Sequence, residues 1–120
     1  MRRVLIVEDD TDLQHLFKSV LKKASLVTTI LSDGRSLFDN ALPDLYIFDI
    51  ELPHINGLEL CKQVKSDSRT RHIPVLIVSG SAHLLEKAKE FSADDALEKP
   101  FERRHLVEHV LLLLAKRAIA

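Results

Sequence analysis

The sequence predicts an α/β fold, with a five-stranded parallel sheet in the order 2-1-3-4-5 and five flanking helices. Short apolar runs alternate five times with stretches of helical periodicity, an order typical of parallel strands joined by right-handed helical crossovers. The 120 residues contain no linker, repeat or low-complexity segment, and a chain of this length buries a substantial core. We therefore expect one domain over residues 1–120, with a strand order that is common for five-stranded sheets.

The expected strands are short apolar runs bounded by turn residues. Three of the runs lack polar alternation, as expected of parallel strands that are covered on both faces. Asp33-Gly34, Pro43, Pro53, Pro74 and Gly80 punctuate the segments between runs. The strands are expected over residues 4–7, 26–30, 45–48, 75–78 and, with a weaker signal, 96–97.

The expected helices follow apolar spacing. In the first helix, apolar residues recur at i, i+3, i+4, i+7 and i+8 from Leu13 to Leu21. Thr11 and Gln14 resemble a capping box at the start of this helix. Further helices are expected over residues 36–41, 58–64, 84–91 and 106–114.

Composition excludes several classes of protein. The formal net charge is -1 and the basic residues form scattered pairs, so direct nucleic-acid binding is not expected. No apolar run reaches the length of a membrane span, and the first run is too short for a signal-peptide core. Cys61 is the only cysteine, which excludes an internal disulfide and a cysteine-based zinc site. These features favour a cytoplasmic domain.

Chemistry-bearing residues stand at the ends of the expected strands. Glu8-Asp9-Asp10 follows the first strand, Asp49 closes the third, Ser79 closes the fourth and Lys99 follows the fifth. In an open α/β sheet these ends meet at the edge where ligands bind. Converging carboxylates favour a hard divalent cation such as Mg²⁺. A carboxylate beside such a cation can act as a nucleophile and form an aspartyl phosphate.

Five segments resemble the receiver domain of two-component response regulators, which has a flavodoxin-like fold. They are residues 5–10, 44–53, 56–57, 73–79 and 99–101. No single segment is specific, but together they span nearly the whole chain in the family's order. The resemblance implies that Asp49 is the phosphoacceptor and that Glu8, Asp9, Asp49 and the backbone carbonyl of Glu51 hold Mg²⁺. It also implies that Ser79 is the switch hydroxyl, that Lys99 pairs with the phosphoryl group and that the Lys99–Pro100 bond is cis.

The function implied is a phosphorylation-controlled switch in a phosphorelay. A histidine kinase or histidine phosphotransfer protein donates the phosphoryl group, and the face formed by helix 4, strand 5 and helix 5 changes its partner binding. The domain assists its own phosphorylation and dephosphorylation but is not expected to be an enzyme for an outside substrate. Two alternatives are disfavoured. The first is a receiver-like binding module that no longer uses phosphate, and the complete set of site residues argues against it: Glu8, Asp9, Asp49, Ser79 and Lys99. The second is a Mg²⁺-dependent phosphatase with an aspartyl intermediate, whose Asp-x-Asp pattern Glu8-Asp9-Asp10 does not match.

Several residues have simpler interpretations. Asp10 is expected to cap the first helix, and Cys61 to pack in the core. His105 and His109 are spaced i, i+4, but without a third ligand we expect a solvated helix face.

Other residues depart from the family pattern. Ala96 stands where the family carries a switching aromatic, Gly80 follows Ser79, and Glu51 adds an acid two residues after Asp49.

The last expected helix is more apolar than one buried face requires. Leu106, Val110, Leu113 and Leu114 form a core stripe, which leaves Val107, Leu111 and Leu112 on neighbouring faces. This surplus indicates either shallow packing or a contact surface for a homodimer or for the kinase.

Overall fold

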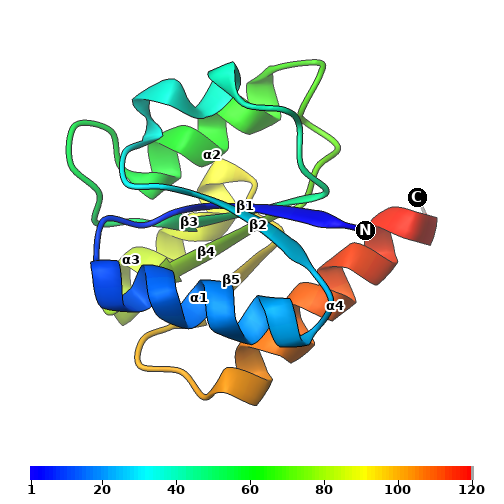
Figure 1. Cartoon of the computed structure of the whole chain (residues 1–120). Helices are drawn as coiled ribbons and strands as arrows, with labels where there is room; N and C mark the ends of the chain where they lie inside the picture. The colour runs from blue at the N-terminus through cyan, green and yellow to red at the C-terminus, as the bar shows by residue number, and fades with distance from the viewer. Residues whose placement is uncertain (120) are drawn as a thin grey trace.

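A computed structural model describes the backbone of residues 1–119 and the side chains of residues 1–117. Its centre is a five-stranded parallel sheet in the order β2-β1-β3-β4-β5, which confirms the predicted topology (Figure 1). The strands are β1 Arg3–Val7, β2 Val27–Leu31, β3 Leu45–Asp49, β4 Val75–Ser79 and β5 Asp95–Glu98.

Helical segments connect the strands and cover both faces of the sheet. They are α1 Thr11–Lys23, η1 Gly34–Asp39, α2 Gly57–Ser66, α3 Ala82–Glu86, η2 Lys87–Phe91 and α4 Arg103–Ile119. The segment expected over residues 36–41 is a 3₁₀ helix, and the one expected over 84–91 is divided into α3 and η2. With α3 and η2 taken as one connection, five helical segments flank the sheet in the described residues, as predicted.

The core consists of two apolar layers. On one face, Phe17, Val20 and Leu21 of α1 pack with the stripe of α4 against the inward residues of the strands. On the other face, η1, α2 and η2 pack on the alternate residues of the same strands. Strands β1, β3 and β4 are buried almost throughout, because both their faces are covered. In the part of the chain that the structure describes, β2 pairs only with β1 and stays half-buried, as expected of an edge strand.

The predicted capping box at the start of α1 is wrong. Asp10 is the N-cap, and its carboxylate accepts hydrogen bonds from the backbone N–H groups of Asp12 (2.8 Å) and Leu13 (3.1 Å). The Gln14 side chain instead donates to the Glu8 carbonyl oxygen and to the Ser32 hydroxyl. Asp10 thus satisfies the free N–H groups of the first turn, as its simpler interpretation predicted, and Gln14 fixes the backbone next to the sheet edge.

Helix α4 buries the predicted stripe and exposes part of its apolar surplus. Leu106, Val110, Leu113 and Leu114 lie in the core, and Val107 packs partly against it. The side chains of Leu111 and Leu112 are 46% and 55% exposed. The His109 side chain stays 32% exposed, but it also contacts the sheet, because its Nδ1 lies 2.5 Å from Oδ2 of Asp95 and joins α4 to β5.

Within residues 1–119, no helix combines the length and the apolar character that crossing a membrane requires.

Candidate functional site

Three carboxylates meet at the carboxyl edge of the sheet. Parallel pairing of β1 with β3 sets Val7 beside Phe48, so the residues that follow lie side by side. Glu8, Asp9 and Asp49 each present one oxygen, and the three oxygens lie within 4.8 Å of one another. Glu8 is 1% and Asp49 5% exposed, whereas Asp9 faces solvent. The cluster is therefore a mostly buried negative site with one open side.

Lys99 reaches the same cluster from the end of β5. Its ammonium nitrogen lies 2.9 Å from Oε1 of Glu8 and 3.0 Å from Oδ2 of Asp49. The backbone N–H of Lys99 donates to the Ser79 carbonyl oxygen, which ties the ends of β4 and β5 together. The Lys99–Pro100 peptide bond is cis, as the resemblance implied.

Burial and pairing shift the protonation of this site. Burial raises the pKa of Glu8 to about 7; a hydrogen bond with Asp49 adds to this rise, while the ammonium of Lys99 opposes it. Burial also disfavours the charged form of Lys99, but its hydrogen bonds to Glu8 and Asp49 outweigh that effect and hold its pKa above the ordinary value. The single ammonium thus offsets only part of the carboxylate charge.

The donor set fits a small divalent cation. Carboxylate oxygens are the ligands that Mg²⁺ prefers, and Mg²⁺ usually keeps several waters beside a few protein ligands. The exposed side of Asp9 leaves room for those waters. In this respect the structure brings together Glu8, Asp9 and Asp49 as the sequence predicted.

The loop between β3 and α2 is held close to Asp49. The backbone N–H of Glu51 donates to Oδ1 of Asp49 at 3.2 Å, and the N–H of Gly57 donates to the Ile50 carbonyl oxygen at 3.1 Å. Asn56 caps α2 with a hydrogen bond from the N–H of Glu59. The start of α2 and the Asp49 backbone therefore form one tightly packed unit.

Ser79 lies in the site but points its hydroxyl group at Glu51. Ser79 is fully buried, and its O–H donates to Oε1 of Glu51 at 2.5 Å. The backbone N–H of Ser81 donates to the Ser79 oxygen at 3.0 Å. The sequence predicted Glu51 only as a carbonyl ligand and missed this side-chain contact. The sequence signal that could have revealed this contact is the acid at position 51, because it follows β3 at the same sheet edge where Ser79 ends β4.

Ala96 borders a hollow between β5 and the helical segments α3 and η2. A cavity of about 390 Å³ is lined by apolar and charged residues of α3, η2, β5 and the turn between η2 and β5: Leu85, Glu86, Ala88, Lys89, Ala93, Asp94, Asp95 and Ala96. The methyl group of Ala96 fills little of this space. The departure noted in the sequence thus corresponds to an open hollow on the α3–η2–β5–α4 face, the counterpart of the helix 4–strand 5–helix 5 face.

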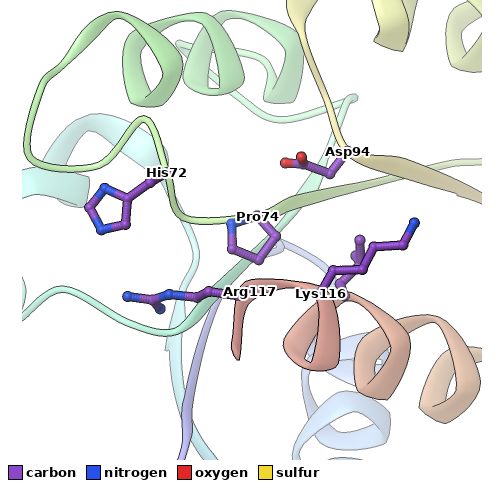
Figure 2. Close-up of a pocket in the computed structure, with 6 residues that line it drawn as sticks. His72, Pro74, Asp94, Lys116 and Arg117 are labelled. Carbon is purple, nitrogen blue, oxygen red and sulfur yellow. The ribbon is translucent and has the colours of Figure 1, made fainter. Parts of the chain in front are cut away.

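A second hollow lies at the opposite end of the strands. Figure 2 shows His72, Pro74, Asp94, Lys116 and Arg117 around a cavity of about 180 Å³. Arg117 is already engaged, because it donates to the Pro43 carbonyl oxygen and to Asp44. This hollow is separated from the carboxylate cluster by the length of the sheet.

A parallel sheet in this order, with acids after its first strand and at the end of its third and a lysine after its fifth, places the chain among signalling domains of the flavodoxin-like fold. The chain belongs to the response regulator receiver domain family, whose sequence profile matches residues 4–111.

Curated relatives support this assignment. The response regulator ArlR of Staphylococcus epidermidis is 33% identical over 98% of this chain and 54% of its own length. The DNA-binding dual master transcriptional regulator RpaA of Synechocystis is 32% identical over 97% of this chain and 50% of its own length. The chain therefore spans about half the length of these relatives.

Solved structures show the same fold. A chain from Chloroflexus aurantiacus described as a response regulator superposes with a TM-score of 0.88 at 33% identity, covering 95% of this chain and 98% of that chain. The signal receiver domain of a signal transduction histidine kinase from Syntrophus aciditrophicus superposes with a TM-score of 0.89 at 29% identity, covering 97% and 92%. Receiver domains with this fold thus occur both in response regulators and in a histidine kinase.

Proposed function

We propose that this receiver domain is a phosphorylation-controlled switch that accepts a phosphoryl group on Asp49. The donor is a phosphohistidine of a histidine kinase or of a histidine phosphotransfer protein. The main support is the contact of Asp49 with Lys99 inside the carboxylate cluster, since it combines an acceptor oxygen with a half-buried cation that can bind phosphoryl oxygens.

The transfer step forms one bond and breaks one. A carboxylate oxygen of Asp49 attacks the phosphorus atom, the phosphorus–nitrogen bond to the donor imidazole breaks, and that imidazole keeps the electron pair. Lys99 donates hydrogen bonds to phosphoryl oxygens, which replace part of its present contacts with Glu8 and Asp49. The domain in this way assists its own phosphorylation, and attack of water on the acyl phosphate returns it to the resting state.

A Mg²⁺ ion would be held by Glu8, Asp9, Asp49 and the carbonyl oxygen of Glu51. Its charge would offset that of the incoming phosphoryl group. Glu8 and Asp49 are buried and Asp9 is exposed, so Asp9 is the residue at which the ion enters. The Lys99 ammonium alone leaves the cluster negative, which favours a cation there.

The output of the switch is the α3–η2–β5–α4 face. Ser79 closes β4 directly before the loop that leads to α3, so rotation of its hydroxyl toward a phosphoryl group moves this loop. Ala96 provides no large ring to follow that movement. The change therefore reaches α3 through the backbone of Gly80 and Ser81, and a partner reads it beside the hollow at Ala96.

The exposed leucines of α4 are a second part of this proposal. Leu111 and Leu112 form an apolar surface on a helix whose other leucines are buried. We assign this surface to contact with a second copy of the chain or with the kinase, because exposed apolar patches usually mark partner sites. Leu111→Glu is expected to weaken either self-association, measured by sedimentation, or phosphoryl transfer from the kinase. If both stay unchanged, the two leucines are not a contact surface.

Transfer from a phosphorylated histidine phosphotransfer protein tests the proposal directly. Borohydride reduces an aspartyl phosphate to homoserine, so peptide mass mapping locates the modified residue. Conversion at position 49 is expected. Transfer to another residue, or none, would contradict the proposal.

The single buried thiol of Cys61 also fits the reducing cytoplasm, where we place the domain.

A further inference from the structure

The Ser79 hydroxyl already donates a hydrogen bond in the structure. Its O–H donates to the Glu51 carboxylate at 2.5 Å, and its oxygen accepts the N–H of Ser81 at 3.0 Å. A hydroxyl has one proton and donates one hydrogen bond at a time. The Ser79 side chain is fully buried, so in this arrangement its hydroxyl has no contact with bulk water.

A phosphoryl group on Asp49 needs the same proton. In the proposed function, Ser79 turns its O–H to a phosphoryl oxygen. It can do so only after it releases Glu51. The released carboxylate belongs to an exposed residue, so it is hydrated again at little cost.

We propose that Glu51 is a positioning residue: its carboxylate competes with the phosphoryl group for the Ser79 hydroxyl and holds Ser79 in the resting orientation. This inference rests on the proposed function. Glu51 is well placed for the task, because its backbone N–H donates to Oδ1 of Asp49 while its side chain holds Ser79. One residue thereby connects the acceptor carboxylate to the switch hydroxyl, and phosphorylation must break the second connection.

Simple repulsion is the rival explanation for any effect of Glu51. A negative side chain near the site disfavours a negative phosphoryl group whether or not it contacts Ser79. The two explanations differ when Ser79 is removed. Competition for the hydroxyl disappears in Ser79→Ala, whereas repulsion by the Glu51 charge persists there.

A double-mutant cycle on beryllofluoride binding separates them. The dissociation constant of beryllofluoride in excess Mg²⁺ is measured by NMR for the wild type, Glu51→Ala, Ser79→Ala and the double variant. Glu51→Ala is expected to bind about tenfold more tightly than the wild type, since it frees a charge-assisted hydrogen bond. In the Ser79→Ala background the same substitution is expected to change binding by less than about twofold.

Two further variants sharpen the measurement. Glu51→Gln keeps an acceptor oxygen but loses the charge, so its dissociation constant is expected to lie between those of the wild type and Glu51→Ala. Glu59→Ala removes an exposed acid from the first turn of α2 and is expected to bind like the wild type. Thermal unfolding of every variant confirms that each has folded.

Each outcome decides between the explanations. An equal gain from Glu51→Ala in both backgrounds would overturn the competition and leave only repulsion. No gain in either background would overturn it as well. A wild type that binds beryllofluoride with Mg²⁺ supports the proposed function whatever the cycle shows. A wild type that fails to bind would contradict the proposed function and the competition together.

Discussion

Gly57 lies so close to Asp49 that a Cβ atom on it would be 2.2 Å from the Asp49 carbonyl oxygen. This contact packs the start of α2 directly against the end of β3. No side chain fits there without displacing backbone, because real Cβ contacts of that length do not occur. The position of the acceptor carboxylate thus depends on a residue eight positions further along the chain.

Gly57→Ala is therefore expected to destabilise the fold. The added methyl group forces the start of α2 away from Asp49, with a loss of about 1–3 kcal/mol in the free energy of unfolding. Gly80→Ala is the matched control, since a Cβ there meets nothing within 4 Å. Denaturant unfolding compares the two. Equal stability of both variants would contradict the close packing of Asp49 with α2.

Glu8→Gln is expected to stabilise the metal-free protein in a pH-dependent manner. Burial raises the pKa of folded Glu8 from 4.5 to about 7, so between these values the folded state binds a proton that the unfolded state has lost. Wild-type stability therefore falls as the pH rises through this window, and the loss is complete above pH 7.

The gain from Glu8→Gln should be about 1–3 kcal/mol at pH 8 and much smaller at pH 4.5. Urea unfolding in EDTA at both pH values measures it. Added Mg²⁺ should reduce the difference at pH 8, because the ion stabilises the wild-type carboxylate. A gain of the same size at both pH values would mean that burial of the Glu8 charge is not its source.

Asp9 is expected to act as a metal ligand, and Asp10 is expected to act as a helix cap. Asp9→Ala should weaken Mg²⁺ binding, because it removes one of the three clustered oxygens. Asp10→Ala should leave Mg²⁺ binding nearly intact but lower stability by about 0.5–2 kcal/mol, since it removes the cap of α1. NMR titration with Mg²⁺ and thermal unfolding of both variants distinguish the roles, and equal losses of Mg²⁺ affinity would exclude this division.

Lys99→Ala is expected to separate phosphorylation from its structural response. Some phosphoryl transfer should remain, because Asp49 and the metal ligands are still present. The phosphorylated conformation, however, should lose a charge-assisted contact worth about 1.5–3 kcal/mol. A two-state switch needs a difference of this order to change its populations. A phosphorylated Lys99→Ala protein with the spectrum of the phosphorylated wild type would count against this role.

The sequence predicted the sheet and the cluster better than it predicted local contacts. Buried strands appear as continuous apolar runs, so the sheet could be predicted from the hydrophobic pattern. The order of the strands then brings Glu8, Asp9, Asp49 and Lys99 to one edge, so the cluster could be predicted as well. The start of α1 was less accessible. Asp10 and Thr11 are both good caps, and only the geometry shows that Gln14 binds the Glu8 backbone instead.

Contacts between distant side chains were not encoded in any local pattern. His109 pairs with Asp95 across 14 residues, and Ser79 with Glu51 across 28. Helical spacing alone gives no sign of the contact between His109 and Asp95. The division of the fourth connection into α3 and η2 was hidden for a similar reason, because the apolar spacing of residues 84–91 also fits one continuous helix.

Phosphorylation of Asp49 adds a fixed mass to the chain, so intact-mass analysis detects it without further treatment. The wild type and Asp49→Asn are incubated with acetyl phosphate in Mg²⁺ and, separately, in excess EDTA. We predict that one phosphoryl group is added to the wild type in Mg²⁺, and that the addition is lost both in EDTA and in Asp49→Asn. Undiminished addition to Asp49→Asn would contradict the assignment of the acceptor, and undiminished addition in EDTA would contradict the role of the metal.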